Sequence, residues 1–215
     1  MSLAADFVKI SDSKGREMSA RLVSYKPGHV TVLNEANRKQ YTLPLESLSE
    51  DSQDLVNQWV DSGEHLPARF TVKYTSGKSD RLENAADYDD RVLKLRPKIY
   101  ISNKSTSSKS RPVELTCAVI GRSVLNKKNL YVFSRESFMI DSLPPLGKSE
   151  SMMKDVMVTY DDNDMAQFGY KYIGYAIKLE SNGIVLYSHF TPSSAGTKYG
   201  DQIFESSVKS VLRPN

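Results

Sequence analysis

The stretch that decides the fold begins Phe7-Val8-Lys9-Ile10-Ser11-Asp12-Ser13-Lys14-Gly15-Arg16 and runs on to Trp59. Apolar and polar residues alternate in four parts of it, over residues 7–16, 18–25, 28–33 and 39–45. An alternation with a period of two places one face of a strand in a core and the other face in water. Tight turns are expected at residues 12–15, 26–28 and 35–38, which supply glycine, proline, aspartate or asparagine. We therefore expect strands that pair as antiparallel hairpin neighbours in a small barrel.

A short amphipathic helix is expected after the fourth strand. Ser49 is a favourable N-cap, and Glu50 and Asp51 in the first turn oppose the positive end of the helix dipole. One apolar stripe follows, formed by Leu55, Val56, Trp59 and Val60. Such a stripe can cover the open end of a small barrel, and Gly63 would end the helix. The large ring of Trp59 is expected to lie in the core rather than to serve as a ligand platform.

Several motifs in this stretch carry a family resemblance: Phe7, Ser11-Asp12-Ser13-Lys14-Gly15, Ala20-Arg21-Leu22-Val23, Val30-Thr31-Val32, Tyr41-Thr42-Leu43-Pro44-Leu45, Leu48-Ser49-Glu50-Asp51 and Trp59. In order and spacing they resemble the Sla-one homology domain, which is named from a fungal endocytic adaptor and is also found in exported bacterial proteins. The resemblance covers about a quarter of the chain. It implies an SH3-like barrel with a short C-terminal helix over residues 1–65.

The resemblance also implies that this barrel binds a peptide. In the fungal adaptor the domain reads sorting signals with the help of basic residues in its third hairpin. Here that hairpin reads Leu33-Asn34-Glu35-Ala36 and lacks the basic pattern, so the adaptor's peptide specificity is not carried over. Hairpin tips and exposed aromatic residues of such barrels tend to meet ligands, which selects Tyr25, Arg38, Lys39 and Tyr41 as candidate peptide-binding residues. Tyr41 alternates with Leu43, however, and could instead belong to the core.

Residues 66–215 are expected to form a second domain, an immunoglobulin-like β-sandwich. Strands are predicted at residues 68–75, 93–101, 112–122, 130–140, 152–160, 170–179 and 184–190. Pro97 lies inside the second of these and suggests an edge or a bulge. An Asn182-Gly183 turn marks a hairpin between the last two strands. Residues 202–212 fit either a strand or a short helix. This many strands without an intervening helix are typical of a sandwich, so the whole chain is predicted to be mostly β.

Composition excludes several classes of protein. The net charge is +3, from 29 basic and 26 acidic residues spread along the 215-residue chain, which argues against a nucleic-acid partner. No apolar run approaches the roughly 18 residues of a membrane span. A structured domain is expected almost directly after Met1-Ser2-Leu3-Ala4-Ala5-Asp6, which looks like a vector-derived start joined to a mature terminus. We therefore expect an exported protein, periplasmic or extracellular, whose natural gene encodes a removed signal.

The sequence carries no recognisable catalytic motif. Cys117 is the single cysteine, and its place in an apolar strand predicts a buried residue rather than a nucleophile. His29, His65 and His189 have no partner at metal-ligand spacing. No Gly-x-Ser-x-Gly elbow and no phosphate-binding loop is present. We therefore expect a protein that is not an enzyme and needs no cofactor.

Two acidic clusters are open to two interpretations. Asp161, Asp162 and Asp164 form one, and Asp87, Asp89 and Asp90 form the other. Loops rich in oxygen ligands can bind calcium, and we select the first cluster as a candidate calcium site. The alternative is a polar turn, because aspartate and asparagine favour turn conformations.

Five tyrosines crowd the last third of the chain: Tyr160, Tyr170, Tyr172, Tyr175 and Tyr187. Strict alternation places Tyr170 and Tyr172 on one face of their strand and Ile173 and Tyr175 on the other. An exposed row of tyrosines would suit a glycan or another ligand. The alternative is ordinary aromatic pairing across strands.

Three functional hypotheses follow. The first is a non-catalytic protein- or peptide-binding scaffold of the bacterial envelope or exterior. The second is a carbohydrate-binding accessory domain or a hydrolase with an unrecognised carboxylate pair, which two buried acids about 5–10 Å apart in one cleft would favour. The third is nucleic-acid binding by the barrel, which would need a clustered basic face that the linear charge pattern does not contain.

Overall fold

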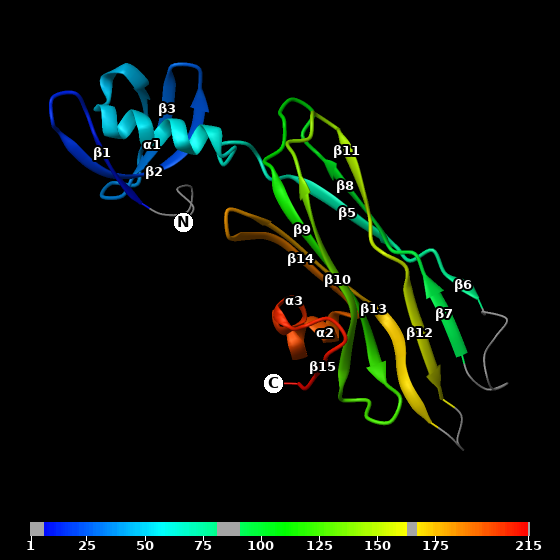
Figure 1. Cartoon of the computed structure of the whole chain (residues 1–215). Coiled ribbons are helices and arrows are strands. Elements are labelled where there is room, and N and C mark those ends of the chain that lie inside the picture. The colour runs from blue at the N-terminus through cyan, green and yellow to red at the C-terminus, as the bar shows by residue number, and fades with distance from the viewer. Residues whose placement is uncertain (1–6, 81–90, 163–166, 215) are drawn as a thin grey trace.

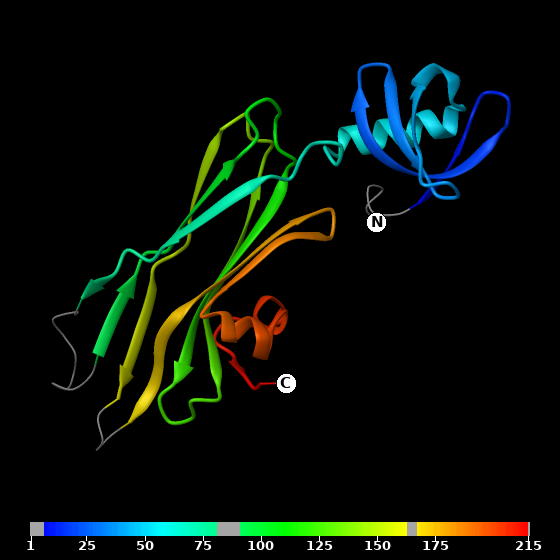
Figure 2. The same cartoon turned by 180° about the vertical axis from the view of Figure 1, so that it is seen from behind.

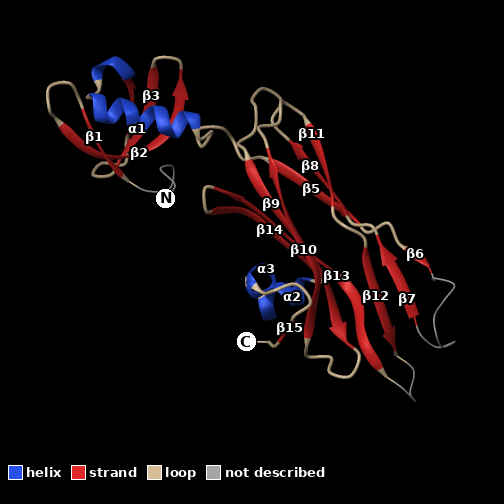
Figure 3. Ribbon diagram, viewed as in Figure 1, coloured by secondary structure: helices blue, strands red, loops and turns tan. Residues whose placement is uncertain are grey.

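The structure, a computed structural model, describes residues 7–80, 91–162 and 167–214 (Figure 1). Strands dominate it, and the few helices are short, apart from one at the end of the N-terminal part (Figure 3). The prediction of a mostly β fold is therefore confirmed. The N-terminal part and the strands that follow the linker are separated in both views of the molecule (Figures 1 and 2).

The N-terminal part is a four-stranded antiparallel sheet with the order β1-β2-β3-β4. Its elements are β1 (Val8–Ser11), β2 (Glu17–Lys26), β3 (His29–Asn34), β4 (Gln40–Pro44), the 3-10 helix η1 (Leu45–Ser47) and α1 (Glu50–Asp61). Gly15 and Gly28 have φ of +77°, which the tight turns before β2 and β3 require and which glycine adopts at little cost. The predicted strands and helix are thus observed in the predicted order.

The sheet curls into a barrel because its two ends are joined by backbone hydrogen bonds. The Ser13 amide donates to the Ser47 carbonyl at 2.9 Å, and the Ser49 amide donates to the Ser11 carbonyl at 2.9 Å. An antiparallel bridge between Asp12 and Leu48 lies between these two bonds. We call residues 7–61 the barrel and this junction of its ends the seam.

Helix α1 covers one opening of the barrel. Its N-cap is Ser49, whose hydroxyl accepts from the Ser52 amide at 3.4 Å. The barrel core contains Ile10, Ala20, Leu22, Val30, Val32, Leu48, Val56 and Trp59. Trp59 is 1% exposed, so the expectation that it serves as a core residue is confirmed.

The C-terminal part contains two sheets that pack face to face. Its strands are β5 (Phe70–Thr75), β6 (Ser79–Asp80), β7 (Arg91–Leu95), β8 (Lys98–Asn103), β9 (Val113–Ser123), β10 (Leu130–Ile140), β11 (Lys148–Met152), β12 (Val156–Asp161), β13 (Phe168–Ser181), β14 (Ile184–Thr191) and β15 (Val211–Leu212). The large sheet has the order β15-β10-β9-β13-β12-β7-β6, with β14 also paired to β13, and the small sheet has the order β11-β8-β5. Their shared core includes Ile99 and Ile101 of β8, Leu115 and Val119 of β9, and Ile177 of β13. A β-sandwich is therefore present, as expected.

One predicted strand is wrong because it is broken in its middle, and the start of a second is misplaced. The run predicted over residues 93–101 is two strands, β7 in the large sheet and β8 in the small one. Pro97 lies at the break, where it has no N–H to continue a ladder. Of the run predicted over residues 152–160, residues 156–160 belong to β12, whereas Met152 is the last residue of β11 and residues 153–155 belong to neither strand. The Met153 amide donates to the Pro97 carbonyl at 3.1 Å. The segment between β7 and β8 and the segment between β11 and β12 therefore pass from one sheet to the other side by side.

Helix α2 (Ser193–Tyr199) was not predicted, because the strands were expected to follow one another without an intervening helix. This helix and α3 (Gln202–Glu205) cover the face of the large sheet that points away from the small sheet. Small residues allow this close approach, since Ala118 and Ala176 lie beneath α2 and α3 in one buried cluster. A Cβ added to Gly196 of α2 would lie 2.5 Å from the Phe190 ring. The ambiguous segment 202–212 contains both alternatives, α3 and then β15.

A β-bulge in β13 changes which face its tyrosines occupy. The register with β9 shifts between Tyr172 and Gly174, so Tyr172 and Tyr175 both pack against the core between the sheets. Ile173 packs against the helix-covered face instead. The strict alternation predicted for this strand is therefore wrong, because the extra residue of a bulge reverses the side of everything that follows.

A linker of residues 62–69 joins the barrel to the sandwich, and Arg111 holds it. The Arg111 backbone amide donates to the Pro67 carbonyl at 3.1 Å. Its guanidinium donates to the Leu66 carbonyl at 3.3 Å and also to the Glu64 carbonyl. The Glu64 carboxylate accepts from the Asn182 side chain at 2.5 Å, at the tip of the β13–β14 hairpin. The linker is thereby tied to the start of β9 and to the tip of the β13–β14 hairpin.

His65 of the linker packs against the barrel. The rings of Tyr25 and Trp59 meet its imidazole edge-on, with centroids 6.0 and 5.9 Å away. Burial lowers the pKa of His65, and the nearby Arg111 charge lowers it further. The neutral imidazole is therefore the form that fits between the two parts of the chain.

We predict that Gly174→Ala destabilises the sandwich by at least about 3 kcal/mol, because overpacking of this kind is costly. A Cβ at Gly174 would lie 1.9 Å from the Thr191 carbonyl oxygen, so the β13–β14 pairing would have to shift. The measurement is urea denaturation followed by circular dichroism, since the single tryptophan lies in the barrel and does not report on the sandwich.

Gly183→Ala is the matched control for this measurement. Gly183 has a φ of +78°, but no atom lies within 4 Å of the position of its added Cβ. Only the backbone cost of about 1–2 kcal/mol is therefore expected. Equal losses in the two variants would contradict the steric explanation for Gly174.

Candidate ligand-binding pocket of the barrel

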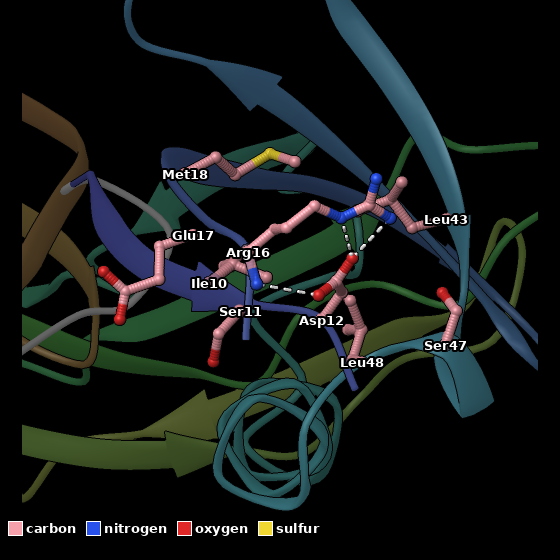
Figure 4. Close-up of a pocket in the computed structure, with 9 residues that line it drawn as sticks. All are labelled: Ile10, Ser11, Asp12, Arg16, Glu17, Met18, Leu43, Ser47 and Leu48. Atoms are coloured by element: carbon pink, nitrogen blue, oxygen red, sulfur yellow. Dashed lines mark hydrogen bonds and ion pairs between the residues drawn. The ribbon is translucent and has the colours of Figure 1, made fainter. Parts of the chain in front are cut away.

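A pocket of about 380 Å³ opens beside the seam of the barrel (Figure 4). Its lining comes from the end of β1, the β1–β2 turn, the start of β2, β4, the end of η1 and the residue after η1: Ile10, Ser11, Asp12, Arg16, Glu17, Met18, Leu43, Ser47 and Leu48. Its volume falls at the lower end of the range for ligand pockets, about 300–1,000 Å³. The seam creates this pocket, because it brings η1 next to the β1–β2 turn.

The floor of the pocket is apolar. Ile10 and Leu48 are 1% and 3% exposed and belong to the barrel core. Met18 and Leu43 are half-buried and pack against that core from its edge. An apolar side chain of a ligand could therefore gain contacts with four side chains that the barrel already holds in place.

An ion pair between Asp12 and Arg16 crosses the rim. The Arg16 guanidinium donates to the Asp12 carboxylate at 2.7 Å from Nε and at 2.6 Å from Nη2. The backbone amides of Arg16 and Lys14 donate to the other carboxylate oxygen at 2.9 and 3.0 Å. These backbone bonds, with the Arg16 one as the largest cause, lower the pKa of Asp12 below its usual value of 3.8. Asp12 is therefore an ionised anchor that fixes the position of Arg16.

Arg16 keeps donors free for a ligand. A guanidinium has five N–H groups, of which two point at Asp12. The Arg16 side chain is 79% exposed, so its remaining donors reach solvent. In Figure 4 this side chain extends across the pocket above Asp12 toward Leu43. A carbonyl or carboxylate oxygen of a ligand could bind there while an apolar group enters the pocket.

The other rim residues are polar, and their side chains form hydrogen bonds or ion pairs with neighbouring residues of the barrel. Glu17 forms an ion pair with Lys9 at 2.7 Å. The Ser47 hydroxyl donates to the Pro44 carbonyl at 2.6 Å, and the Ser11 and Ser49 hydroxyls lie 2.7 Å apart. These contacts hold the η1 side of the pocket against the turn.

The residues predicted to bind a peptide lie elsewhere. Arg38, Lys39 and Tyr41 gather at the hairpin between β3 and β4, where Arg38 has a φ of 56° and Tyr41 is 39% exposed. Tyr25 lies apart from them and packs against His65 of the linker. None of the four lines the pocket.

The pocket residues themselves were missed by the sequence reasoning, although a signal was present. Asp12 and Arg16 flank the Ser13-Lys14-Gly15 turn four positions apart, and the turn belongs to the motif that carries the family resemblance. Opposite charges at this spacing around a glycine turn can pair. The contribution of Leu43 and Leu48 could not be foreseen, because it depends on how the barrel closes.

The candidate calcium residues are only partly described. Asp162 binds two cations, Lys171 at 2.9 Å and Arg91 at 3.4 Å, and these contacts lower its pKa, with the Lys171 hydrogen bond as the largest cause. Asp161 is buried. Asp164 and the second cluster, Asp87 to Asp90, lie outside the described residues. Within the described part of the chain, no three His, Cys, Asp or Glu side chains are grouped to hold a metal ion.

Most of the crowded tyrosines pair with neighbouring rings. Tyr74 and Tyr175 stack at a centroid distance of 3.9 Å between the two sheets, and Tyr131 and Tyr170 stack at 4.1 Å. Tyr187 is 36% exposed and stacks on His189 at 6.3 Å. The first two contacts join rings of different strands, which was one of the two alternatives, whereas Tyr187 and His189 both belong to β14. Cys117 is fully buried, as expected, and burial raises its pKa.

A second pocket, of about 440 Å³, lies on the sandwich where β9, β10 and the β13–β14 hairpin meet. Glu114 and Glu180 both line it and are directly opposed on neighbouring strands. Glu180 also binds Lys178 at 2.8 Å. Glu114 and Glu180 are the acidic residues among those that line this pocket, so a carbohydrate hydrolase acting here would have to use them.

The fold and the pocket define a mostly β chain in which a small barrel with an apolar-floored pocket precedes a β-sandwich. No helix in the described residues is long and apolar enough to cross a membrane. No protein-family model matches the chain, and no curated protein matches it. Among solved structures it is similar to a crystal structure from Akkermansia muciniphila, with 7% identity over 70% of this chain and 96% of that chain and a TM-score of 0.32. A likeness this weak identifies no family and carries no argument about function.

We predict that carbon-detected NMR titration finds the pKa of the Asp12 carboxyl below 3.8, and that Arg16→Gln raises it. The increase should be partial, because the Arg16 backbone amide still donates to the carboxylate. Since the pKa is lowered by folding, the charged form stabilises the barrel above the unfolded pKa, and this contribution is lost as the pH falls through the folded value. Lys14→Gln is the control, because only the backbone amide of Lys14 contacts Asp12. An equal increase in both variants would count against the ion pair.

Proposed function

We propose that this chain is a non-catalytic protein- or peptide-binding scaffold, and that the barrel pocket receives an apolar side chain of an extended peptide. The observation that carries the proposal is the pairing of an apolar floor with one anchored, exposed guanidinium on the rim. Ile10, Met18, Leu43 and Leu48 supply the floor, and Arg16 supplies donors for a backbone carbonyl or a carboxylate of the peptide. Sites of this kind use a few fixed polar groups to orient a mostly apolar ligand.

The family resemblance agrees with this proposal. We propose that residues 1–65 are an SH3-like barrel of the Sla-one homology type, and that residues 66–215 are a separate sandwich domain that carries it. We also propose that the protein acts in the bacterial envelope or exterior, where barrels of this type occur. The barrel core is drawn from residues 8–60 alone, which supports a separate unit.

The test is selection of peptides from a random display library on the full chain, followed by affinity measurement of the enriched peptides. We predict that Met18→Glu weakens binding by at least about tenfold, because a carboxylate on the floor disfavours an apolar side chain. Arg16→Ala should weaken binding by a smaller factor. Circular dichroism of each variant verifies that the barrel remains folded.

Lys39→Glu is the matched control, because it changes an exposed charge at the β3–β4 hairpin and leaves the pocket unchanged. Binding should then be the same as for the unmodified chain. If Lys39→Glu weakens binding and Met18→Glu does not, the ligand occupies the hairpin selected from the sequence instead of the pocket.

The alternative function is a carbohydrate-binding accessory domain or a hydrolase. Glu114 and Glu180 are opposed in the second pocket, but Glu114 is exposed and Glu180 is only half-buried, so they do not meet the criterion of two buried acids. A screen of oligosaccharides for binding and cleavage separates this alternative from the first proposal, and cleavage that Glu114→Gln abolishes would establish the hydrolase.

A further inference from the structure

We propose that β14 is a pairing edge through which two copies of this chain join their large sheets. Within the described residues β14 pairs with β13 alone, so its other edge carries backbone groups that no second strand satisfies. In Figures 1 and 2 the β13–β14 hairpin projects from the sandwich, with no other strand beside β14. An eight-residue strand with a free edge is a template for pairing with another strand.

Charge distinguishes β14 from the other edge strands. Five described strands longer than two residues pair with one strand only, namely β1, β4, β5, β11 and β14. Four of them carry charges or a proline: Lys9 in β1, Pro44 in β4, Lys73 in β5, and Lys148 and Glu150 in β11. Such residues protect an edge against pairing. Strand β14 reads Ile184-Val185-Leu186-Tyr187-Ser188-His189-Phe190-Thr191 and carries no Asp, Glu, Lys, Arg or proline.

Strand β14 exposes large apolar side chains that a neighbouring strand could cover. Val185 is 51% exposed and Tyr187 is 36% exposed, although both are large and apolar. Tyr187 stacks on His189, and His189 meets Tyr175 of β13 at 5.8 Å, so these rings form a row along β14. A neighbouring strand could continue this row by cross-strand contacts.

A second copy of the chain fits this edge better than a charged partner. Two identical strands related by a two-fold axis pair antiparallel, and each residue then meets its symmetry-related position. Ser188 lies next to the midpoint of β14, and the register that places it opposite its own copy overlaps residues 185–191 and places Tyr187 opposite His189. No like charges meet in this arrangement. The same operation on β11 would bring Glu150 against itself, which is unfavourable.

The experiment is light scattering and sedimentation of the full chain over a range of concentrations. The unmodified chain is expected to form a dimer in a concentration-dependent way. Ser188→Lys should weaken the dimer on the order of tenfold, because it places two ammonium groups opposite each other. Leu125→Lys is the matched control, since it adds the same charge at a residue that is 71% exposed in the β9–β10 turn, and it should leave the dimer unchanged.

Oxidative cross-linking tests the geometry of pairing. Ser188→Cys should give a disulfide-linked dimer under mild oxidation, because Cys117 is buried and the introduced thiol is accessible. Ser193→Cys, at the exposed start of α2, should not do so. A chain that stays monomeric, a dimer that both lysine variants weaken equally, or a dimer that Ser188→Cys fails to cross-link would overturn the proposal. Because β14 shares no residue with the barrel pocket, Met18→Glu should leave the dimer intact, so failure of one proposal is distinguishable from failure of the other.

Discussion

The crossing at Pro97 and Met153 is the constraint on which the C-terminal part depends. On one side of it β7 pairs with β12 in the large sheet, and on the other side β8 pairs with β11 in the small sheet. Pro97 cannot donate to a ladder, but its carbonyl accepts a hydrogen bond from the Met153 amide. The segment between β7 and β8 and the segment between β11 and β12 therefore leave the large sheet side by side. Strand β8 then packs over β9 and β13. Without this break, Ile99 and Ile101 would lie in one wide sheet with no second layer to bury them.

The parts of the fold that could be predicted are those determined by interactions between residues close together in the sequence. Alternation and turn chemistry are local, and they correctly gave the barrel strands, α1 and the Asn182-Gly183 hairpin. The breaks at Pro97 and Met153 depend on which sheet each half of a strand joins. The bulge before Gly174 depends on close contact with Thr191, and α2 depends on small residues in a distant part of the sheet. No window of sequence contains either kind of information.

The candidate site was hidden for a related reason. Each pocket residue is ordinary where it stands in the sequence: Asp12 and Arg16 belong to a turn, and Met18 and Leu43 belong to alternating strands. Only the seam, which joins segments that are far apart in the chain, brings η1 beside that turn. The residues selected from the sequence were exposed residues of hairpins, because hairpin tips can be recognised from a short stretch of sequence. Tyr25 shows the limit of that approach, because its ring packs edge-on against the linker histidine His65.

The hold of Arg111 on the linker has a mechanical consequence. If a bound partner pulls on the barrel, the force enters the sandwich at the start of β5 and, through the Arg111 bonds to Leu66 and Pro67, at the start of β9. Strand β9 pairs with β10 on one side and β13 on the other along most of its length. Tension along such a strand shears many hydrogen bonds at once instead of opening them one by one. The linker is thus a tether that passes tension to a strand with partners on both sides.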